Sequence, residues 1–338
     1  MENLISKTEN TANSSKKRVH ILATGGTIAG MADSPIDLLG YTAGAASIKD
    51  LLACIPEINT LAELHAETFC GIASENGSPE LWISIARRAA EVLADPAVDA
   101  LVVTSGTDTL EEMSYFLDIV LDDSKPVVVV GAMRPFSAYS PDGTVNLHNA
   151  VAVATAAESA GKGVLVVMND TIMTARGVSK ADSFRVNTMT GGEFGTLGWV
   201  AAGDVHYGAL PLRRSRADVA IDLSAITHPA KVEIFYMAGG ADARLLHYMV
   251  ELGAQGVVLA GFGSGTFSDA VRAEIENLQR RGIPVVLTSR ARSGLVHSSL
   301  PGLIEAGDLT PQQARVLLMA ALSAGLDAAA VARCFGVY

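Results

Sequence analysis

Two glycine-rich turns place hydroxyl side chains directly after predicted β-strands. The first turn carries Thr27 behind Gly25 and Gly26, and the second, residues 104–109, contains Thr107. Glycine lets the backbone turn sharply and approach a ligand closely, and a threonine hydroxyl can act as a nucleophile if a base activates it. An ordinary tight turn also explains Thr27, and the residue pattern alone favours that simpler interpretation.

The second turn precedes a predicted helix, which offers another simple explanation. Thr107 and Asp108 are residue types that often cap helix N-termini, where a carboxylate also favours the helix dipole. Alternatively, free backbone N–H groups there could hold an oxyanion while Thr107 bonds a reacting group. Lys180 lies in a predicted polar loop, where it is either a solvated surface lysine or a base in a partly buried site. Without other information, the cap and the surface lysine are favoured.

Short apolar runs alternate with helical patterns along most of the chain. The predicted strands span residues 19–24, 100–104, 126–130, 164–168, 232–237, 256–260 and 284–288. The predicted helices span residues 81–94, 110–120, 146–157, 269–281 and 311–323. This alternation predicts an α/β fold with a mostly parallel sheet. Ligands bind beyond the carboxyl ends of such strands, where both turns lie.

The alternation breaks between residues 191 and 230, which are rich in glycine, proline and scattered charges. We expect a hairpin there, followed by a linker. The predicted organisation is a disordered polar tail at residues 1–18, a larger domain at 19–210, a linker at 211–230 and a smaller domain at 231–338. Two domains also suit a chain of 338 residues.

Composition argues against several classes of partner. The formal net charge of −11 does not suggest binding to nucleic acid or to an anionic membrane. The three cysteines, Cys54, Cys70 and Cys334, lack zinc-ligand spacing and are typical of free thiols in a reducing compartment. No signal peptide is recognisable at the N-terminus. We therefore expect a cytoplasmic protein, or a periplasmic one if an export signal has been removed.

Nucleotide-binding fingerprints fail at the glycine turns. A dinucleotide loop starting at Gly25 would need glycine where Thr27 stands, and no phosphate-binding G-x-x-x-x-G-K-[ST] motif occurs. A nucleotide-binding protein would then rest on the fold class alone, which does not specify function.

The two turns together resemble the two signature motifs of bacterial L-asparaginases, including the glutaminase-asparaginases. The motifs are ILATGGTIAG at residues 21–30 and TSGTDTLEE at residues 104–112. Similarity continues through residues 125–135, 166–171 and 314–318. It covers nearly the whole chain from about Val19, and two motifs in order are far more specific than either alone. The chain is identified as a member of this family.

The resemblance implies a fold, an assembly and a reaction. The larger domain would contain a flavodoxin-like parallel sheet with helices on both faces, and the smaller would also be α/β. The protein would be a homotetramer with active sites between paired subunits, using no metal and no cofactor. It would hydrolyse the side-chain amide of L-asparagine to L-aspartate and ammonia, with possible side activity on L-glutamine.

The resemblance also implies catalytic roles. Thr27 would attack the amide carbon to form an acyl-enzyme, and Tyr41, on a mobile loop, would help activate it. Thr107, Asp108 and Lys180 would form a second polar group in which Lys180 assists proton transfer. The Thr107 amide would help stabilise the oxyanion.

Four further residues would bind the substrate. Ser74 and Glu75 would hold its α-carboxylate and α-ammonium ends, with Asp108 also near the ammonium. Ala132 would contact the substrate amide through its backbone. Ser264 is a candidate contact from a neighbouring subunit.

The chain departs from the family pattern at three places. Ser105 stands where the second motif usually has histidine, so we expect altered kinetics or loop packing. Glu75 replaces the glutamine of some members, a choice that accompanies looser discrimination between asparagine and glutamine. Residues 293–303 lack the acidic residue that a neighbouring subunit often contributes, and Glu305 or Ser264 could substitute for it.

Two alternative functions share this scaffold, and the sequence argues against the second. A non-catalytic amino-acid-binding or regulatory protein would be consistent with Ser105 and the missing acidic residue. The amidase subunit of a tRNA-dependent amidotransferase shares the threonine motifs but carries an extra N-terminal domain, and only about twenty residues precede the first strand here.

Overall fold

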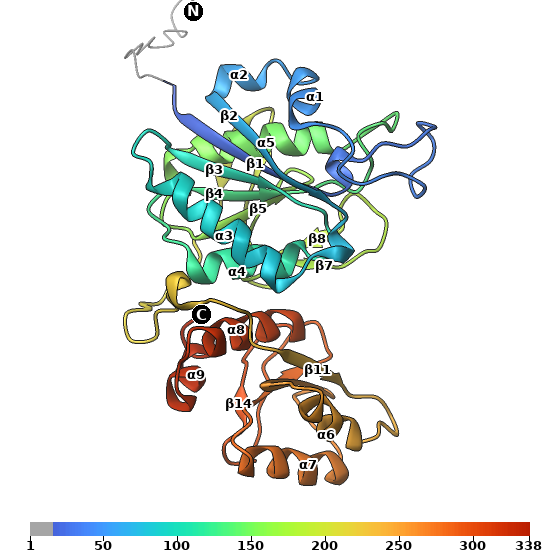
Figure 1. The fold of residues 1–338 in the computed structure, drawn as a ribbon. Coiled ribbons are helices and arrows are strands. Elements are labelled where there is room, and N and C mark those ends of the chain that lie inside the picture. Colours follow the sequence, from blue (N-terminus) through green and yellow to red (C-terminus); the bar gives the residue numbers. More distant parts are fainter. Residues whose placement is uncertain (1–15) are drawn as a thin grey trace, which may run out of the picture.

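The computed structural model describes residues 16–338 (Figure 1). The predicted disordered tail, residues 1–18, therefore lies almost entirely outside the described residues. Two sheets, each covered by helices, follow one another along the chain, as the predicted α/β class requires. Within residues 16–338, no helix combines the length and the apolar character needed to cross a membrane.

The larger sheet has eight strands in the order β10-β9-β6-β5-β4-β3-β1-β2. Their bounds are β1 Arg18–Gly25, β2 Glu63–Ile72, β3 Ala100–Thr104, β4 Val127–Val130, β5 Val164–Met168, β6 Thr171–Thr174, β9 Thr196–Ala201 and β10 Asp204–Tyr207. Strands β2-β1-β3-β4-β5 are parallel. This is the flavodoxin-like order 2-1-3-4-5. Strands β6, β9 and β10 extend the sheet in antiparallel fashion.

Helices cover both faces of the larger sheet, as predicted. One face packs against α3 (Pro79–Ala94) and α4 (Leu110–Val120). The other packs mainly against α5 (Gly143–Thr155), with the short α1 (Ile48–Ala53) and α2 (Ile58–Leu61) near β1. The strands between these layers are buried on both faces, which explains their continuous apolar runs.

The smaller C-terminal sheet is parallel, with four strands in the order β11-β12-β13-β14. Its strands are β11 Val232–Tyr236, β12 Gly256–Gly261, β13 Val285–Ser289 and β14 Ile304–Glu305. Its helices are α6 Arg244–Glu251, α7 Asp269–Arg280, α8 Pro311–Ser323 and α9 Ala328–Cys334. Helices α6 and α7 cover one face. Helix α8 covers the other and also packs on α4, which joins the two cores.

The remaining elements are short. A separate two-stranded sheet pairs β7 (Ser179–Lys180) with β8 (Met189–Thr190). Single turns of 3-10 helix are η1 Thr27–Ala29, η2 Ser74–Asn76, η3 Ala157–Ser159 and η4 Leu223–Ala225. Residues 208–222, within and before the predicted linker, contain no helix or strand.

The structure contains elements that the sequence patterns did not predict. Strand β2 was missed because it lies at the sheet edge and alternates polar residues with partly buried ones. Helices α1, α2, α6 and α9 were missed because each has eight residues or fewer. The predicted start of α8 is confirmed, since the Thr310 hydroxyl accepts a hydrogen bond from the Gln313 N–H and Pro311 follows the cap.

Candidate active site

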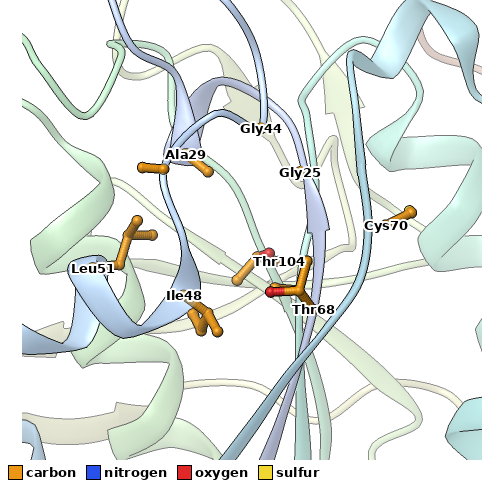
Figure 2. A pocket seen from close by; sticks show the side chains of 10 residues that line it. Gly25, Ala29, Gly44, Ile48, Leu51, Thr68, Cys70 and Thr104 are labelled. Carbon is orange, nitrogen blue, oxygen red and sulfur yellow. The ribbon is translucent and has the colours of Figure 1, made fainter.

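The turn after β1 lies over a small cavity, seen in Figure 2. The cavity is lined by Ala23, Gly25, Ala29, Gly44, Ala46, Ile48, Leu51, Thr68, Cys70 and Thr104. Burial raises the pKa of the Cys70 thiol, which donates a hydrogen bond to the Thr24 carbonyl at 3.3 Å. None of the predicted catalytic side chains lines this cavity. It is therefore a packing gap beneath the turn, separate from the predicted site.

Thr27 is paired with Tyr41. The Thr27 hydroxyl is 2.6 Å from the Tyr41 hydroxyl, and Thr27 is only 8 % exposed. The segment that carries Tyr41 is closed by an antiparallel bridge, in which Met31 and Thr42 exchange backbone hydrogen bonds of 3.0 and 2.8 Å. The tyrosine ring also packs against Gly30, where an added Cβ would meet it at 2.6 Å. These contacts hold one hydroxyl directly against the other.

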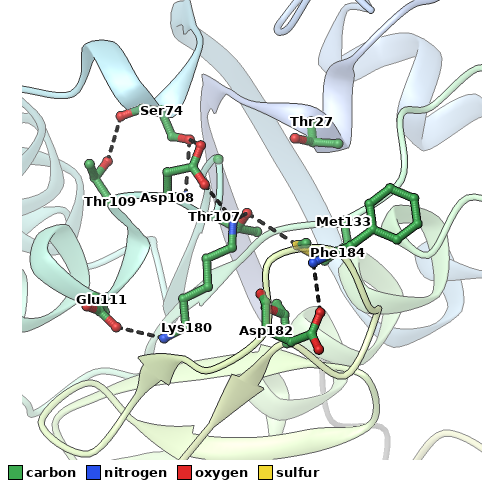
Figure 3. Close-up of polar contacts among 12 residues, drawn as sticks. Thr27, Ser74, Thr107, Asp108, Thr109, Glu111, Met133, Lys180, Asp182 and Phe184 are labelled. Atoms are coloured by element: carbon green, nitrogen blue, oxygen red, sulfur yellow. Dashed lines mark hydrogen bonds and ion pairs between the residues drawn. The ribbon is translucent and has the colours of Figure 1, made fainter. Parts of the chain in front are cut away.

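Thr107, Asp108 and Lys180 form a second polar group (Figure 3). The Lys180 Nζ donates to the Thr107 hydroxyl at 2.9 Å and to the Asp108 carboxylate at 2.5 Å. Thr107 is buried, whereas the Asp108 side chain is 54 % exposed. The Thr107 hydroxyl is thus enclosed beside a lysine, while the Asp108 carboxylate is exposed to solvent.

The cap interpretation of this turn is wrong. Helix α4 begins at Leu110, and no side chain forms a cap hydrogen bond at its N-terminus. Thr107 and Asp108 bond Lys180 instead, and the Thr109 hydroxyl donates to the Ser74 carbonyl at 2.9 Å. Nor does Lys180 lie in a loop, since it forms part of β7. The Thr107 hydroxyl and the Asp108 carboxylate therefore form tertiary contacts and do not cap the helix.

Ser74 connects the turn at the end of β2 to this group. Its hydroxyl accepts a hydrogen bond from the Asp108 N–H at 3.1 Å and donates to the Asp108 carboxylate at 3.2 Å. Ser74 is 9 % exposed. The predicted substrate-binding serine and the second threonine turn therefore form one unit.

The two threonine turns are in direct backbone contact. Gly26 has φ +81°, and a Cβ added there would lie 2.3 Å from the Cα of Gly106. Only glycine combines this φ with so close an approach. The contact brings the Thr27 turn beside the Thr107 turn, as the prediction of a single site requires.

Ala132 lies in a third turn, after β4. It is fully buried, and its neighbours are held by the next helix. The Asp142 carboxylate accepts hydrogen bonds from the N–H groups of Met133 and Arg134, and the Asn146 amide donates to the Gly131 carbonyl at 3.1 Å. The turn is thus fixed at the same sheet edge, while the predicted backbone contact to substrate stays a prediction.

Among the described residues, three predicted ones make no side-chain hydrogen bond or ion pair with the threonine turns. Glu75 follows Ser74 but is exposed, and within residues 16–338 its side chain makes no hydrogen bond. Ser264 is exposed in the C-terminal domain, where its carbonyl accepts a hydrogen bond from the His297 N–H at 2.9 Å. Glu305 accepts a bond from the Ser298 N–H and lies 3.5 Å from His297. The latter two residues belong to the C-terminal domain, apart from the threonine turns.

Ser105 is buried behind the second turn, and its hydroxyl donates to the adjacent Gly106 carbonyl at 3.0 Å. It lines a second small cavity together with Ser74 and Trp82. A serine at this position therefore leaves space next to Ser74, the predicted substrate-binding residue.

Two residues of the site were not predicted from the sequence. The Met133 sulfur accepts a 3.4 Å hydrogen bond from the Thr107 hydroxyl. The Glu111 carboxylate accepts a 2.7 Å hydrogen bond from the Lys180 backbone N–H. Burial raises the pKa of Glu111, although the Lys180 N–H partly opposes the shift. The sequence does offer a signal for Glu111: a glutamate among the mostly apolar residues of α4 is a candidate buried carboxylate.

Among residues 16–338, no group of three or more His, Cys, Asp or Glu side chains is arranged to hold a metal ion.

Family models match both halves of the chain. The model for the N-terminal asparaginase domain matches residues 18–213, and that for the glutaminase/asparaginase C-terminal domain matches residues 231–335. The chain belongs to the asparaginase family. This asparaginase is an enzyme, and the family predicted from its motifs is confirmed.

Curated relatives resemble this asparaginase over nearly its full length. It is 37% identical over 336 residues to L-asparaginase 2 of Bacillus subtilis, covering 97% of this chain and 89% of the relative. It is 38% identical over 327 residues to the glutaminase-asparaginase of Pseudomonas fluorescens biotype A, covering 95% and 90%. The crystal structure of a probable cytoplasmic L-asparaginase from Campylobacter jejuni superimposes with a TM-score of 0.91 at 39% identity, covering 96% of this asparaginase and 100% of the other chain.

Proposed function

We propose that this asparaginase hydrolyses the side-chain amide of L-asparagine through a threonine nucleophile. The observation that carries the proposal is the pairing of two buried threonine hydroxyls with different partners in adjoining turns. Thr27 is 2.6 Å from a tyrosine hydroxyl, and Thr107 is 2.9 Å from a lysine ammonium. In this proposal the Thr27 hydroxyl attacks the substrate and the Thr107 hydroxyl assists proton transfer.

In the proposed first step, the Thr27 oxygen attacks the amide carbon as its proton passes to the Tyr41 hydroxyl, which gives up its own proton to solvent. The carbonyl oxygen becomes an oxyanion, which the Thr107 backbone N–H helps stabilise. The C–N bond then breaks, and the nitrogen takes a proton from the Lys180 ammonium through the Thr107 hydroxyl and leaves as ammonia, after which Lys180 regains a proton from solvent. Water repeats the attack on the resulting ester, which releases aspartate and restores the Thr27 hydroxyl.

The zwitterionic end of the substrate needs partners of both signs. The exposed carboxylates of Asp108 and Glu75 suit the α-ammonium, and the Ser74 hydroxyl suits the α-carboxylate. Ala132 would contact the amide through its backbone. Glutamine has the same groups with one more methylene, so we propose side activity on L-glutamine, in keeping with the name of the Pseudomonas relative.

Replacement of the nucleophile tests the mechanism. We expect Thr27→Ala to lower kcat for ammonia release by at least about 1,000-fold, as loss of a covalent nucleophile does, and Thr107→Val to lower it strongly as well. The measurement is ammonia release from L-asparagine with a metal chelator present. Thr60→Ala, an exposed helix position, is the control and should keep the wild-type rate. A folded Thr27→Ala protein with wild-type turnover would refute the assignment.

We also propose that the active enzyme is a homotetramer with sites between paired subunits. Ser264 lies outside the cluster of its own chain, so its predicted role requires a second copy. Light scattering on the purified enzyme should give four times the mass of the 35.1 kDa chain. Full activity in a monomeric fraction would contradict the proposal.

A cytoplasmic location is proposed from the thiols and from the name of the Campylobacter structure. Cys54, Cys70 and Cys334 form no disulfide, as is typical of a reducing compartment. Fractionation of the native cells should recover the activity with cytoplasmic marker enzymes, and recovery with periplasmic markers would overturn this assignment.

A further inference from the structure

A buried carboxylate lies behind the lysine of the second polar group. Glu111, on the first turn of α4, is 6 % exposed. Its Oε2 accepts the backbone N–H of Lys180 at 2.7 Å, and the bond is drawn in Figure 3. A buried carboxylate is destabilising unless hydrogen bonds or charges compensate it. The Lys180 N–H supplies such a hydrogen bond to Glu111.

The Glu111 contact closes a ring of interactions around the lysine. The Lys180 side chain bonds Thr107 and Asp108, which shortly precede α4. Its backbone bonds Glu111, on the first turn of α4. Both ends of Lys180 are therefore fixed to one continuous segment, residues 107–111, although Lys180 itself comes from β7.

Other contacts hold the residues that flank β7: the buried Gln313 amide donates to the Arg176 and Val178 carbonyls. Strand β7 itself contains only Ser179 and Lys180 and pairs with the equally short β8. From the C-terminal domain, Arg292 donates to the Ala181 carbonyl at 3.1 Å, but Arg292 is exposed. A two-residue ladder is weak by itself, whereas the buried Glu111 carboxylate binds the Lys180 N–H directly.

We propose that Glu111 is a positioning residue, whose carboxylate fixes the main chain of Lys180 so that Nζ reaches Thr107 and Asp108. The inference rests on the proposed function, because it assumes that Lys180 takes part in the reaction. It acts through geometry: a displacement of about 1 Å at a catalytic group can lower the rate by about 100-fold.

The adjacent glutamate provides a matched control. Glu112, the next residue of α4, is partly buried, with its side chain 17 % exposed, and burial raises its pKa as it does that of Glu111. Its carboxylate, however, bonds Arg315 of α8 at 3.2 Å, away from the second polar group. Substituting either residue removes a wholly or partly buried carboxylate from the same helix turn, but only the Glu111 substitution releases Lys180.

The experiment compares Glu111→Met, Glu111→Gln and Glu112→Met by steady-state kinetics on L-asparagine. Methionine keeps the side-chain length without a good acceptor, and we expect kcat to fall by about 10- to 100-fold with KM changed by less than about twofold. Glutamine keeps an acceptor oxygen and should retain most of kcat. Glu112→Met should keep kcat even where its melting temperature falls. If Glu111→Met does not fold, Glu111→Ala takes its place.

A double mutant separates this inference from the proposed function. Lys180→Met should be slow, and adding Glu111→Met should slow it no further, because the two act as a unit. Wild-type kcat in Lys180→Met would refute the proposed role of the lysine. A slow Lys180→Met with wild-type kcat in Glu111→Met, or full additivity of the two losses, would refute the role of Glu111 alone.

Discussion

At the scale of single residues, the site combines buried hydroxyls with exposed carboxylates. Thr27 and Thr107 are enclosed, each with a polar partner at hydrogen-bond distance. Asp108 and Glu75 remain open to solvent. In the proposed mechanism, enclosure would orient the weak nucleophile, and exposure would let a carboxylate meet a charged substrate without a large desolvation cost.

Glu75 gives the prediction at this scale. A carboxylate attracts an ammonium over a range of positions, whereas an amide depends on a directional hydrogen bond. Glu75→Gln should therefore tolerate the longer substrate less well. We expect the ratio of kcat/KM for asparagine to that for glutamine to rise by up to about tenfold, since an exposed charge pair contributes on the order of 1 kcal/mol.

The measurement is steady-state kinetics with both amino acids. Glu80→Gln, an exposed glutamate at the start of α3, removes the same charge nearby and should leave the ratio unchanged. An unchanged or lower ratio in Glu75→Gln would show that this side chain does not set substrate preference.

At the scale of elements, the site depends on the parallel strand order. Strands β1 and β3 are neighbours, so the turns that follow them meet at one sheet edge. The turn after β2 adds Ser74 from the other side of β1. The contact between Gly26 and Gly106 then sets how closely the two threonine turns approach.

Gly26→Ala should separate the two turns. A methyl group at this position would lie 2.3 Å from backbone atoms of Gly106, which cannot move independently. We expect a loss of about 2 kcal/mol or more in the free energy of unfolding, from overpacking together with strain at positive φ, and a large fall in kcat.

Gly240→Ala is the matched control, because Gly240 has φ +77° but nothing within 4 Å of an added Cβ. It should cost only the backbone strain, about 1 kcal/mol, with kcat unchanged. Chemical denaturation and ammonia release measure the two effects. Equal stability and activity in the two variants would show that the turn contact is unimportant.

At the scale of the whole molecule, two kinds of contact join the larger and the smaller domain. One is the packing of α4 on α8, and the other is a set of polar contacts. Arg176, which follows β6, forms a two-pronged pair with Asp308 of the C-terminal domain, at 3.1 and 2.7 Å. Arg176 also donates to the Tyr338 carbonyl. The domain boundaries at residues 210 and 231 remain a prediction, but these contacts link the segments on either side of them.

This pair predicts a pH dependence of stability. The hydrogen bond from Arg176 lowers the pKa of Asp308 below its ordinary 3.8. A carboxyl with a lowered folded-state pKa stabilises the protein above its unfolded pKa, and the contribution is lost as pH falls through the folded pKa. Asp308→Asn should therefore destabilise by about 1 kcal/mol at neutral pH, and the difference should vanish in acid.

Denaturant titrations of both proteins from neutral pH down to about pH 2, well below the ordinary pKa of 3.8, would test this. Asp204→Asn removes a charge that, within residues 16–338, forms no ion pair, and it should show no such pH-dependent difference. A stability loss in Asp308→Asn that persists unchanged in acid would rule out the ion pair as its cause.

The sequence by itself determined the fold class, the positions of the main buried strands and the two threonine turns. Apolar runs such as residues 100–104 and 164–168 can be recognised locally. Because these strands are buried on both faces, every residue in them is apolar or small, and the pattern clearly predicts a strand. Glycine beside a hydroxyl at a strand end is likewise local. Thr27 and Thr107 are therefore recognisable as candidate site residues from the sequence, where the family motifs decide against the simpler explanations.

Only the tertiary structure decided the partners of these residues. Ser74 and Lys180 reach Asp108 across 34 and 72 positions of the chain. The apolar residues of α4 mark Glu111 as a candidate buried carboxylate, but only the packing shows that it bonds Lys180. Such contacts depend on strand order and on how helices pack, and no short stretch of residues encodes either. For the same reason Thr107, whose residue type and position favour a helix cap, is instead the hydrogen-bond partner of a lysine.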